Sequence, residues 1–295
     1  MTAGPVVQRP CGLVVDSGAV LTLPPPGVAV VPLGIEVGGR VLLDGLDITL
    51  EEVYSRIAAG ESVRTSTPSP GQYLDAFRAC EAEHLVCLTM SAQLSAMYTS
   101  ATLAARLLAE EGDGRVVDVI DTGTAAAGFG LVARAAALLV SAGASPEEVL
   151  ERVRLAGEEA WVIGSLSTLA HLARSGRVPR LIAGLGDLVG VRPIFELRHG
   201  EARRLGLVRG ERRVQRAFVR EALERVDPAL PVWLVVSHAA ADQEAARVRA
   251  ALHEVLRVGR SEVVALSPVL GSYTGPGMTG FAVMPLRGSE LAEVP

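Results

Sequence analysis

The chain has 295 residues, a formal net charge of −5 and no lysine, and only 4% of its residues are aromatic. This length allows two domains with a substantial core built mainly from Val, Leu and Ala, and the charge gives no reason to expect a nucleic acid partner or an anionic membrane. Because every basic residue apart from histidine is arginine, a P-loop lysine and a lysine Schiff base are excluded.

No segment predicts export, membrane insertion or a metal site. Residues 1–10 lack the pattern of a signal peptide, and the longest apolar stretch, 125–142, is interrupted by Gly128, Gly130 and Arg134. The three cysteines form no Cys-x-x-Cys pair and the five histidines are scattered, so we expect no metal. These features favour a soluble, cytoplasmic protein without stable membrane insertion.

In the first half, short runs rich in β-branched residues alternate with helix-like segments. Such runs are typical of strands buried on both faces of a parallel sheet. Three helices have a readable start, because Thr49, Ser69 and Ser145 each precede a Glu or Gln by three residues, as in a capping box. The alternation predicts a doubly wound, mostly parallel sheet. The predicted strands are 13–15, 28–31, 85–88 and 116–120.

The second half predicts another α/β domain. Residues 161–174 have a helical pattern, 211–226 form an amphipathic helix, and a mixed segment lies between them. Further strands are predicted at 232–236, 263–266 and 281–284, and the glycine-rich segment 271–277 is interpreted as a loop. We place the domains at 11–160 and 161–288.

Polar residues follow three of the predicted strands. Asp16-Ser17, residues 89–95 and Asp121-Thr122 each come directly after a strand of the first sheet. Any one of these segments alone is more simply explained as turn and cap residues. Because ligands of open parallel sheets bind beyond the carboxyl ends of the strands, the three together indicate a binding site.

Two hydroxyl-bearing segments suit an anion in particular. Ser95 precedes a helical pattern over 96–110 and is a candidate N-cap, where free backbone N–H groups favour a carboxylate or phosphate. Thr65-Ser66-Thr67-Pro68 precedes the helix start at Ser69 and can also present hydroxyls. A carboxylate held by hydroxyls and amides, rather than by arginine, remains a usable nucleophile.

Taken in chain order, these segments resemble the DegV family nearly from end to end. Thr65-Ser66-Thr67-Pro68 is similar to the family's Thr-Ser-Gln-Pro, and Leu94-Ser95-Ala96-Met97-Tyr98 is similar to Leu-Ser-Gly-Thr-Tyr. The other matching segments are Val15-Asp16-Ser17, Val30-Val31-Pro32-Leu33, Asp44 with the helix start at Thr49, Val119-Ile120-Asp121-Thr122, Ser175-Gly176-Arg177-Val178, Val191-Arg192-Pro193-Ile194 and the loop from Gly271 to Gly277.

The resemblance implies a fatty acid carrier rather than an enzyme. It implies two α/β domains with a ligand tunnel between them, one palmitate-like long-chain fatty acid and no other cofactor. The ligand's carboxylate is expected on Thr65 and Ser95 with Ala96. It further implies a separate fatty acid kinase subunit that phosphorylates the carried acid for phospholipid synthesis, with Arg177 as a candidate docking residue. Residues expected near the site are Asp16, Ser17, Ser66, Asp121, Tyr273 and Thr274.

This chain departs from the family pattern at the expected site. Tyr273 stands in place of histidine, Ala96-Met97 in place of Gly-Thr, and Thr67 in place of glutamine. Lipid binding tolerates these changes better than phosphoryl transfer does. Two alternatives stay open at this point. One is an autonomous α/β hydrolase or phosphatase, with His238 as a possible base or Asp16 as a nucleophile, and the other is a regulatory small-molecule-binding protein.

Overall fold

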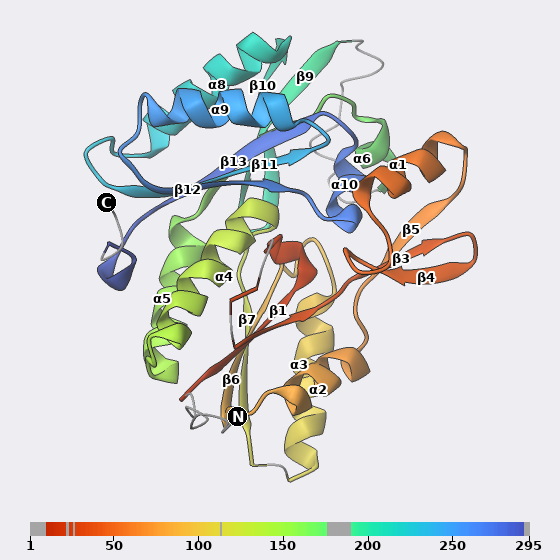
Figure 1. Ribbon diagram of the computed structural model, residues 1–295, viewed down its shortest axis with the longest axis vertical. Helices are drawn as coiled ribbons and strands as arrows, with labels where there is room; N and C mark the ends of the chain where they lie inside the picture. Colours follow the sequence, from red (N-terminus) through yellow and green to blue (C-terminus); the bar gives the residue numbers. More distant parts are fainter. Residues whose placement is uncertain (1–9, 22–23, 26, 113, 176–189, 292–295) are drawn as a thin grey trace, which may run out of the picture.

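The computed structural model describes residues 10–21, 24–25, 27–112, 114–175 and 190–291, and it contains two large β-sheets (Figure 1). Helix α4 (Ala126–Ser141) packs against strands of both sheets and so lies between them. Twelve of its sixteen residues are buried, and its sequence is apolar around almost the whole circumference. A helix with that pattern is stable only when it is covered on all sides.

The first sheet is parallel throughout, as predicted, with the strand order β2-β1-β6-β7. Helices α2 and α3 cover one face, and α4 and α5 cover the other, so the first half is a doubly wound α/β unit (Figure 1). The strands are β1 (Gly12–Asp16), β2 (Val28–Val31), β6 (His84–Thr89) and β7 (Val116–Asp121), and the helices are α2 (Pro70–Ala79), α3 (Met97–Glu110) and α5 (Pro146–Glu159).

The three predicted helix starts are confirmed. Thr49, Ser69 and Ser145 each accept a hydrogen bond from the backbone N–H three residues later, and the Glu or Gln there bonds back to the cap residue's N–H. These capping boxes begin α1 (Leu50–Ala58), α2 and α5. They were predictable because every group in a capping box lies within four residues of sequence.

The second sheet has the order β10-β9-β8-β13-β11-β12 and is mostly antiparallel, with β11 and β12 paired in parallel. Helices α8 and α9 cover one face, and α4 packs on the other (Figure 1). The elements are β8 (Trp161–Ser165), β9 (Val191–Arg198), β10 (Glu201–Arg209), α8 (Glu211–Arg225), β11 (Val232–Ala239), α9 (Asp242–His253), β12 (Val258–Ala265) and β13 (Met278–Pro285).

The helix predicted over 161–174 is wrong at its first half. Residues Trp161–Ser165 form strand β8, which lies in the interior of the second sheet between β9 and β13, and α6 (Ala170–Ser175) follows. Trp161, Val162 and Ile163 are residue types that fit a pleated, buried surface, and pairing with two neighbouring strands outweighed the short helical periodicity.

A third, smaller sheet was not predicted. It has the order β4-β3-β5 and is antiparallel, with β3 (Gly34–Val37), β4 (Arg40–Leu43) and β5 (Val63–Ser66). In Figure 1 it lies beside helices α1, α6 and α10 (Pro268–Thr274), at one end of the space between the large sheets. This sheet therefore brings Thr65, on β5, close to the C-terminal part of the chain.

The proposed domain boundary near residue 160 falls between the two large sheets. Strands β1 to β7 form the first and the small sheet, and strands β8 to β13 form the second. One continuous buried cluster nevertheless includes Val14 of the first sheet and Val235 of the second. The division into 11–160 and 161–288 stays a prediction.

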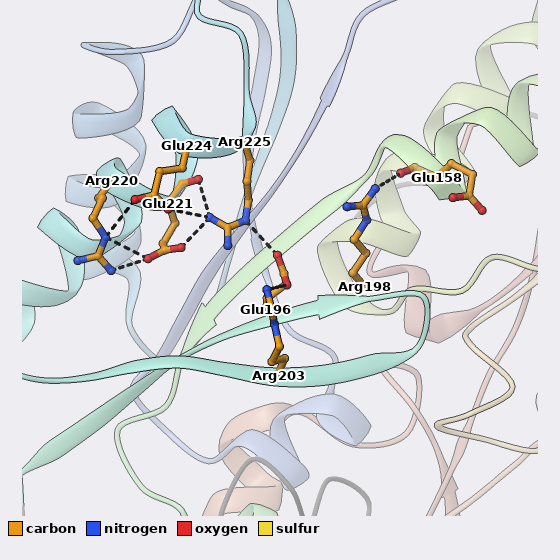
Figure 2. Close-up of polar contacts among 8 residues, drawn as sticks. All are labelled: Glu158, Glu196, Arg198, Arg203, Arg220, Glu221, Glu224 and Arg225. Atoms are coloured by element: carbon orange, nitrogen blue, oxygen red, sulfur yellow. Dashed lines mark hydrogen bonds and ion pairs between the residues drawn. The ribbon is translucent and has the colours of Figure 1, made fainter.

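An Arg–Glu network fastens helix α8 to the β9–β10 hairpin (Figure 2). Arg225 Nε lies 3.0 Å from Glu196 Oε1, and Arg225 Nη1 lies 2.6 Å from Glu221 Oε2. The more exposed Arg203 and Arg220 form ion pairs with Glu196 and Glu221 respectively. Both carboxylates are buried, so their charges are compensated by Arg225 in particular.

Candidate functional site

A largely apolar cavity of about 130 Å³ lies where β5, the start of α3, and helices α6 and α10 meet. We call it the head-group cavity. Its wall contains mostly aliphatic and methionine side chains, and the polar side chains that line it are hydroxyls. The lining residues are Leu33, Thr65, Ser66, Thr67, Met90, Leu94, Ser95, Met97, Ala125, Leu172, Val269, Leu270 and Tyr273.

Four hydroxyl groups meet in two pairs in this cavity. The Oγ1 of Thr65 is in hydrogen-bond contact with the Oη of Tyr273, and the Oγ1 of Thr67 lies 3.3 Å from the Oγ of Ser95. In each pair one hydroxyl donates to the other, so each pair keeps one hydrogen that can point toward a ligand oxygen. The cavity thus offers several neutral donors and, among the described lining residues, no charged side chain.

Each hydroxyl is positioned by a different part of the fold. Thr65 lies on β5 and pairs with Ile35 of β3. Ser95 lies in the turn after β6, where its N–H donates to the Ser91 carbonyl at 3.2 Å. Tyr273 lies on α10, which is tied to α1 by a hydrogen bond of 3.1 Å from the Tyr54 hydroxyl to the Gly271 carbonyl. The site therefore exists only when both halves of the chain are assembled.

The prediction that Ser95 caps α3 is wrong. Helix α3 begins at Met97, the cap position is Ala96, and no side chain hydrogen-bonds there. The Ser95 hydroxyl points instead to Thr67. Ser95 stays a candidate ligand partner, but through its side chain in the cavity rather than as a helix cap.

Several residues predicted to lie near the site do not line the head-group cavity. Ala96 and Asp121 are exposed, and Asp121 Oδ1 accepts from the Gly123 N–H at 2.9 Å, which is the simpler turn role. Thr274 Oγ1 donates back to the Leu270 carbonyl at 3.3 Å. Ser66, by contrast, lines the cavity beside Thr65. Arg177 lies outside the described residues.

The predicted glycine-rich loop is partly helical. Gly271, Ser272, Tyr273 and Thr274 belong to α10, and the backbone leaves the helix at Gly275, whose φ of 74° is in the left-handed region. The helix approaches α1 so closely that a Cβ on Gly271 would lie 2.1 Å from Leu50 Cδ1. This close approach, rather than a turn, explains the glycine at 271.

Asp16 and Ser17 line a second cavity instead. It has a volume of about 390 Å³ and is also lined by Asp44 and Ser267. Burial raises the pKa of Asp16 to about 7, and burial also raises the pKa of Asp44. Two buried carboxyl groups disfavour a carboxylate ligand, so the larger cavity fits a fatty acid head group less well than the smaller one.

Two residues that matter here were not singled out as site residues. Thr67 was noted within a hydroxyl-bearing segment and as a departure from the family pattern, but not as a site residue, yet its hydroxyl contacts Ser95 in the cavity. The spacing to Thr65 could have indicated it, because residues two apart in an extended segment face the same side. Asp44 gave no comparable indication, since its contacts are made with residues far along the chain.

Comparisons with known proteins agree with the arrangement of these elements. A family model described as "Uncharacterised protein, DegV family" matches residues 11–286. The chain belongs to the DegV family. A DegV domain-containing protein of Streptomyces coelicolor is 30% identical over 286 residues, which cover 94% of this chain and 99% of the relative. The resemblance inferred from the motifs is thus confirmed, and so is the DegV-like α/β fold.

Two solved DegV structures are similar over nearly their whole length. A fatty acid-binding DegV family protein of Thermus thermophilus has 31% identity and a TM-score of 0.86, with 95% of this chain and 100% of that chain covered. A DegV family protein of Ruminococcus gnavus with vaccenic acid has 27% identity and a TM-score of 0.84, with 93% and 100% covered.

Among the described residues, no three His, Cys, Asp or Glu side chains are grouped in a way that could hold a metal ion. Within the same ranges, none of the helices is both long enough and apolar enough to cross a membrane.

Proposed function

We propose that this DegV protein is a carrier that binds one long-chain fatty acid with its carboxylate in the head-group cavity. The observation that carries the proposal is the set of hydroxyls of Thr65, Thr67, Ser95 and Tyr273 in the lining of a largely apolar cavity. A carboxylate is an acceptor only, and each of the two hydroxyl pairs keeps one hydrogen that can be donated to it. The fatty acids bound by the relatives from Thermus thermophilus and Ruminococcus gnavus support the same ligand class.

The acyl chain supplies most of the binding free energy. Burial of a methylene contributes roughly 0.8 kcal/mol, so a chain of about fifteen methylenes contributes about 12 kcal/mol before costs. Loss of free motion and ordering of the chain offset several kcal/mol of this. Sub-micromolar affinity follows. The hydroxyls add less free energy, but they fix which end of the ligand reaches them.

A palmitate-like chain needs more room than about 130 Å³. We therefore propose that the head-group cavity lengthens into a tunnel between the two α/β units when the ligand enters. Met90 and Met97 are the wall residues best suited to give way, because the methionine side chain is unbranched and adapts to irregular space.

We further propose that the carrier presents the bound carboxylate to a separate kinase subunit in the cytoplasm, for entry of the acyl phosphate into phospholipid synthesis. A carboxylate held by neutral hydroxyls keeps its charge available for attack on the γ-phosphorus of ATP. Arg177 is the proposed docking residue. With a kinase subunit, ATP and hydroxylamine as a trap, Arg177→Ala should lower acyl hydroxamate formation while leaving the fatty acid bound; unchanged turnover would remove Arg177 from this role.

The alternative of an autonomous hydrolase or phosphatase gains no support from the described residues. His238 is 6% exposed, lines neither cavity, and accepts the Ala241 N–H at Nδ1. Asp16 is fully buried, and its two carboxyl oxygens accept the N–H groups of Gly18 and Met90. A hydrolytic base needs access to a substrate, which His238 lacks, and Asp16, although it lines the larger cavity, already accepts backbone N–H groups at both carboxyl oxygens.

The direct test is to extract the purified protein with organic solvent and analyse the extract by mass spectrometry. One equivalent of a C16 or C18 fatty acid per chain is the expected result. Delipidated protein should then take up palmitate with a stoichiometry of one in isothermal titration calorimetry. A protein that carries no lipid and takes up none would refute the carrier function.

A further inference from the structure

Behind one wall of the head-group cavity lies a buried polar chain formed by Asp16, Ser17 and Asp44. The Ser17 Oγ donates to Asp44 Oδ2 at 2.6 Å, and Asp16 precedes Ser17 at the end of β1. Asp16 and Asp44 are 0% and 4% exposed. Buried carboxyl groups are costly unless their oxygens are hydrogen-bonded, so the partners of these groups indicate why they are there.

The partners are backbone N–H groups of three residues that line the head-group cavity. The Leu33 N–H donates to Ser17 Oγ at 3.1 Å, the Met90 N–H donates to Asp16 Oδ2 at 3.0 Å, and the Val269 N–H donates to Asp44 Oδ1 at 2.8 Å. The side chains of Leu33, Met90 and Val269 all line that cavity. One polar chain therefore fixes the backbone of three wall residues that come from distant parts of the sequence.

Of the three residues, Asp44 contacts the partner that is farthest away in the sequence, because it joins the end of β4 to the start of α10. The N-cap of α10 is Ser267, whose Oγ accepts the Leu270 N–H at 3.4 Å, and Pro268 at the first position has no N–H. The Val269 N–H is the one donor of this first turn that the helix itself does not satisfy. It donates to Asp44, which lies 225 residues earlier in the chain. The start of α10 is thus anchored partly by its own cap and partly by the N-terminal half of the chain.

Helix α10 in turn carries Tyr273 to Thr65. Tyr273 lies one turn beyond Val269 on the same face of the helix, and both side chains line the head-group cavity. A short helix moves nearly as a rigid body, so a shift at its first turn displaces the Tyr273 hydroxyl from the Thr65 hydroxyl. The contact between these two hydroxyls joins the N-terminal and C-terminal halves of the chain at the proposed position of the carboxylate.

We infer that Asp44 is a positioning residue for carboxylate recognition: through the Val269 N–H it sets helix α10 so that Tyr273 and Thr65 together hold the acid group. This role rests on the proposed function of the head-group cavity. This role distinguishes Asp44 from a residue that merely stabilises the fold, because the contact that it sets, between Tyr273 and Thr65, holds only the acid end of the ligand.

The test compares palmitate with 1-hexadecanol, which has the same chain and no carboxylate, in titrations of delipidated protein. Asp44→Ala should weaken palmitate binding about tenfold, the loss expected for one displaced hydrogen bond to a charged group, and change hexadecanol binding less than about twofold. Asp44→Asn keeps an acceptor for the Val269 N–H and should retain most of the affinity. Asp47→Ala is the matched control, because Asp47 lies in the same turn, is exposed, and also accepts a backbone N–H, that of Leu43.

A second pair of variants tests the route through Tyr273. Asp44→Ala combined with Tyr273→Phe should bind palmitate no more weakly than Tyr273→Phe alone, because the two act through one contact. Where Asp44→Ala does not fold, Ser267→Ala loosens the same helix start and should show a smaller selective loss for palmitate. Equal losses for both ligands, additive losses in the double variant, or unchanged palmitate binding would each overturn the role of Asp44. Wild-type protein that does not prefer palmitate to hexadecanol would instead overturn the proposed head-group site.

Discussion

Removing two hydroxyls from the head-group cavity should weaken fatty acid binding strongly while leaving the fold intact. The double variant Thr65→Val with Ser95→Ala keeps the shape of both side chains nearly unchanged, since valine is the isostere of threonine. It leaves Tyr273 and Thr67 without their hydroxyl partners and removes one donor from each of the two hydroxyl pairs. The apolar wall is untouched.

The magnitude follows from what each hydroxyl does. A hydrogen bond to a charged group is worth about 1.5–3 kcal/mol, so the loss of two costs about 3 kcal/mol at the low end, or somewhat more than a hundredfold in Kd. Each single variant should lose about half of this, because it removes one of the two hydrogen bonds. A binding free energy dominated by the acyl chain leaves detectable affinity in the double variant.

Isothermal titration calorimetry with palmitate, on delipidated protein, measures this loss. Thr102→Val is the matched control, because the Thr102 hydroxyl is buried on α3, lies outside the cavity lining and has no hydrogen-bond partner among the residues that the structure describes. It should bind palmitate as the wild type does. Wild-type affinity in the double variant, or an equal loss of affinity for 1-hexadecanol, would show that these hydroxyls do not hold the acid group.

Three further predictions concern the framework around the site. Gly271→Ala should push α10 away from Leu50 of α1, cost about 1–3 kcal/mol of unfolding free energy and weaken palmitate binding, whereas Gly206→Ala, where nothing lies within 4 Å of the added Cβ, should do neither; equal behaviour of the two variants in urea titrations would contradict this. Burial raises the pKa of Asp16 from 3.8 to about 7, so the folded state binds this proton more tightly than the unfolded state. The contribution of Asp16 to the free energy of unfolding is therefore greatest below about pH 4 and is lost as the pH rises through about 7. Between pH 4 and 8 the wild type should lose about 4 kcal/mol relative to Asp16→Asn, at about 1.4 kcal/mol for each pKa unit, and parallel urea-derived stability curves would refute the assignment. Arg225→Ala should cost about 3–5 kcal/mol because it leaves two buried carboxylates short of a partner, while Arg220→Ala, with a side chain 57% exposed, should cost less than about 1 kcal/mol; similar midpoints for both variants would argue against the buried network in Figure 2.

Features that depend on neighbouring residues were predictable from the sequence. The capping boxes at Thr49, Ser69 and Ser145 involve only residues three apart, and the continuous apolar strands of the first sheet are recognisable in single runs of sequence. The position of polar residues after these strands follows from the geometry of any parallel sheet. The order of the motifs along the chain was enough to identify the family.

Features that depend on pairing were not predictable in this way. The helical prediction for 161–165 failed because β8 is stabilised by β9 and β13. The small sheet β4-β3-β5 was missed because it depends on the pairing of β3 with β5, which lies in a separate part of the sequence. The cap role predicted for Ser95 failed because α3 begins one residue later than predicted, with Ala96 at the cap position. For β8 and for the small sheet, pairing between strands decided the local conformation.

The sequence by itself determined the elements of the first half, the ends of its helices and the family. Only the tertiary structure decided that Thr65 would meet Tyr273, and that Asp44 would anchor a helix that begins at Pro268. The physical reason is that helix caps and strand periodicity are local properties of the chain, whereas a hydrogen bond between residues more than two hundred positions apart depends on how both large sheets pack around helix α4.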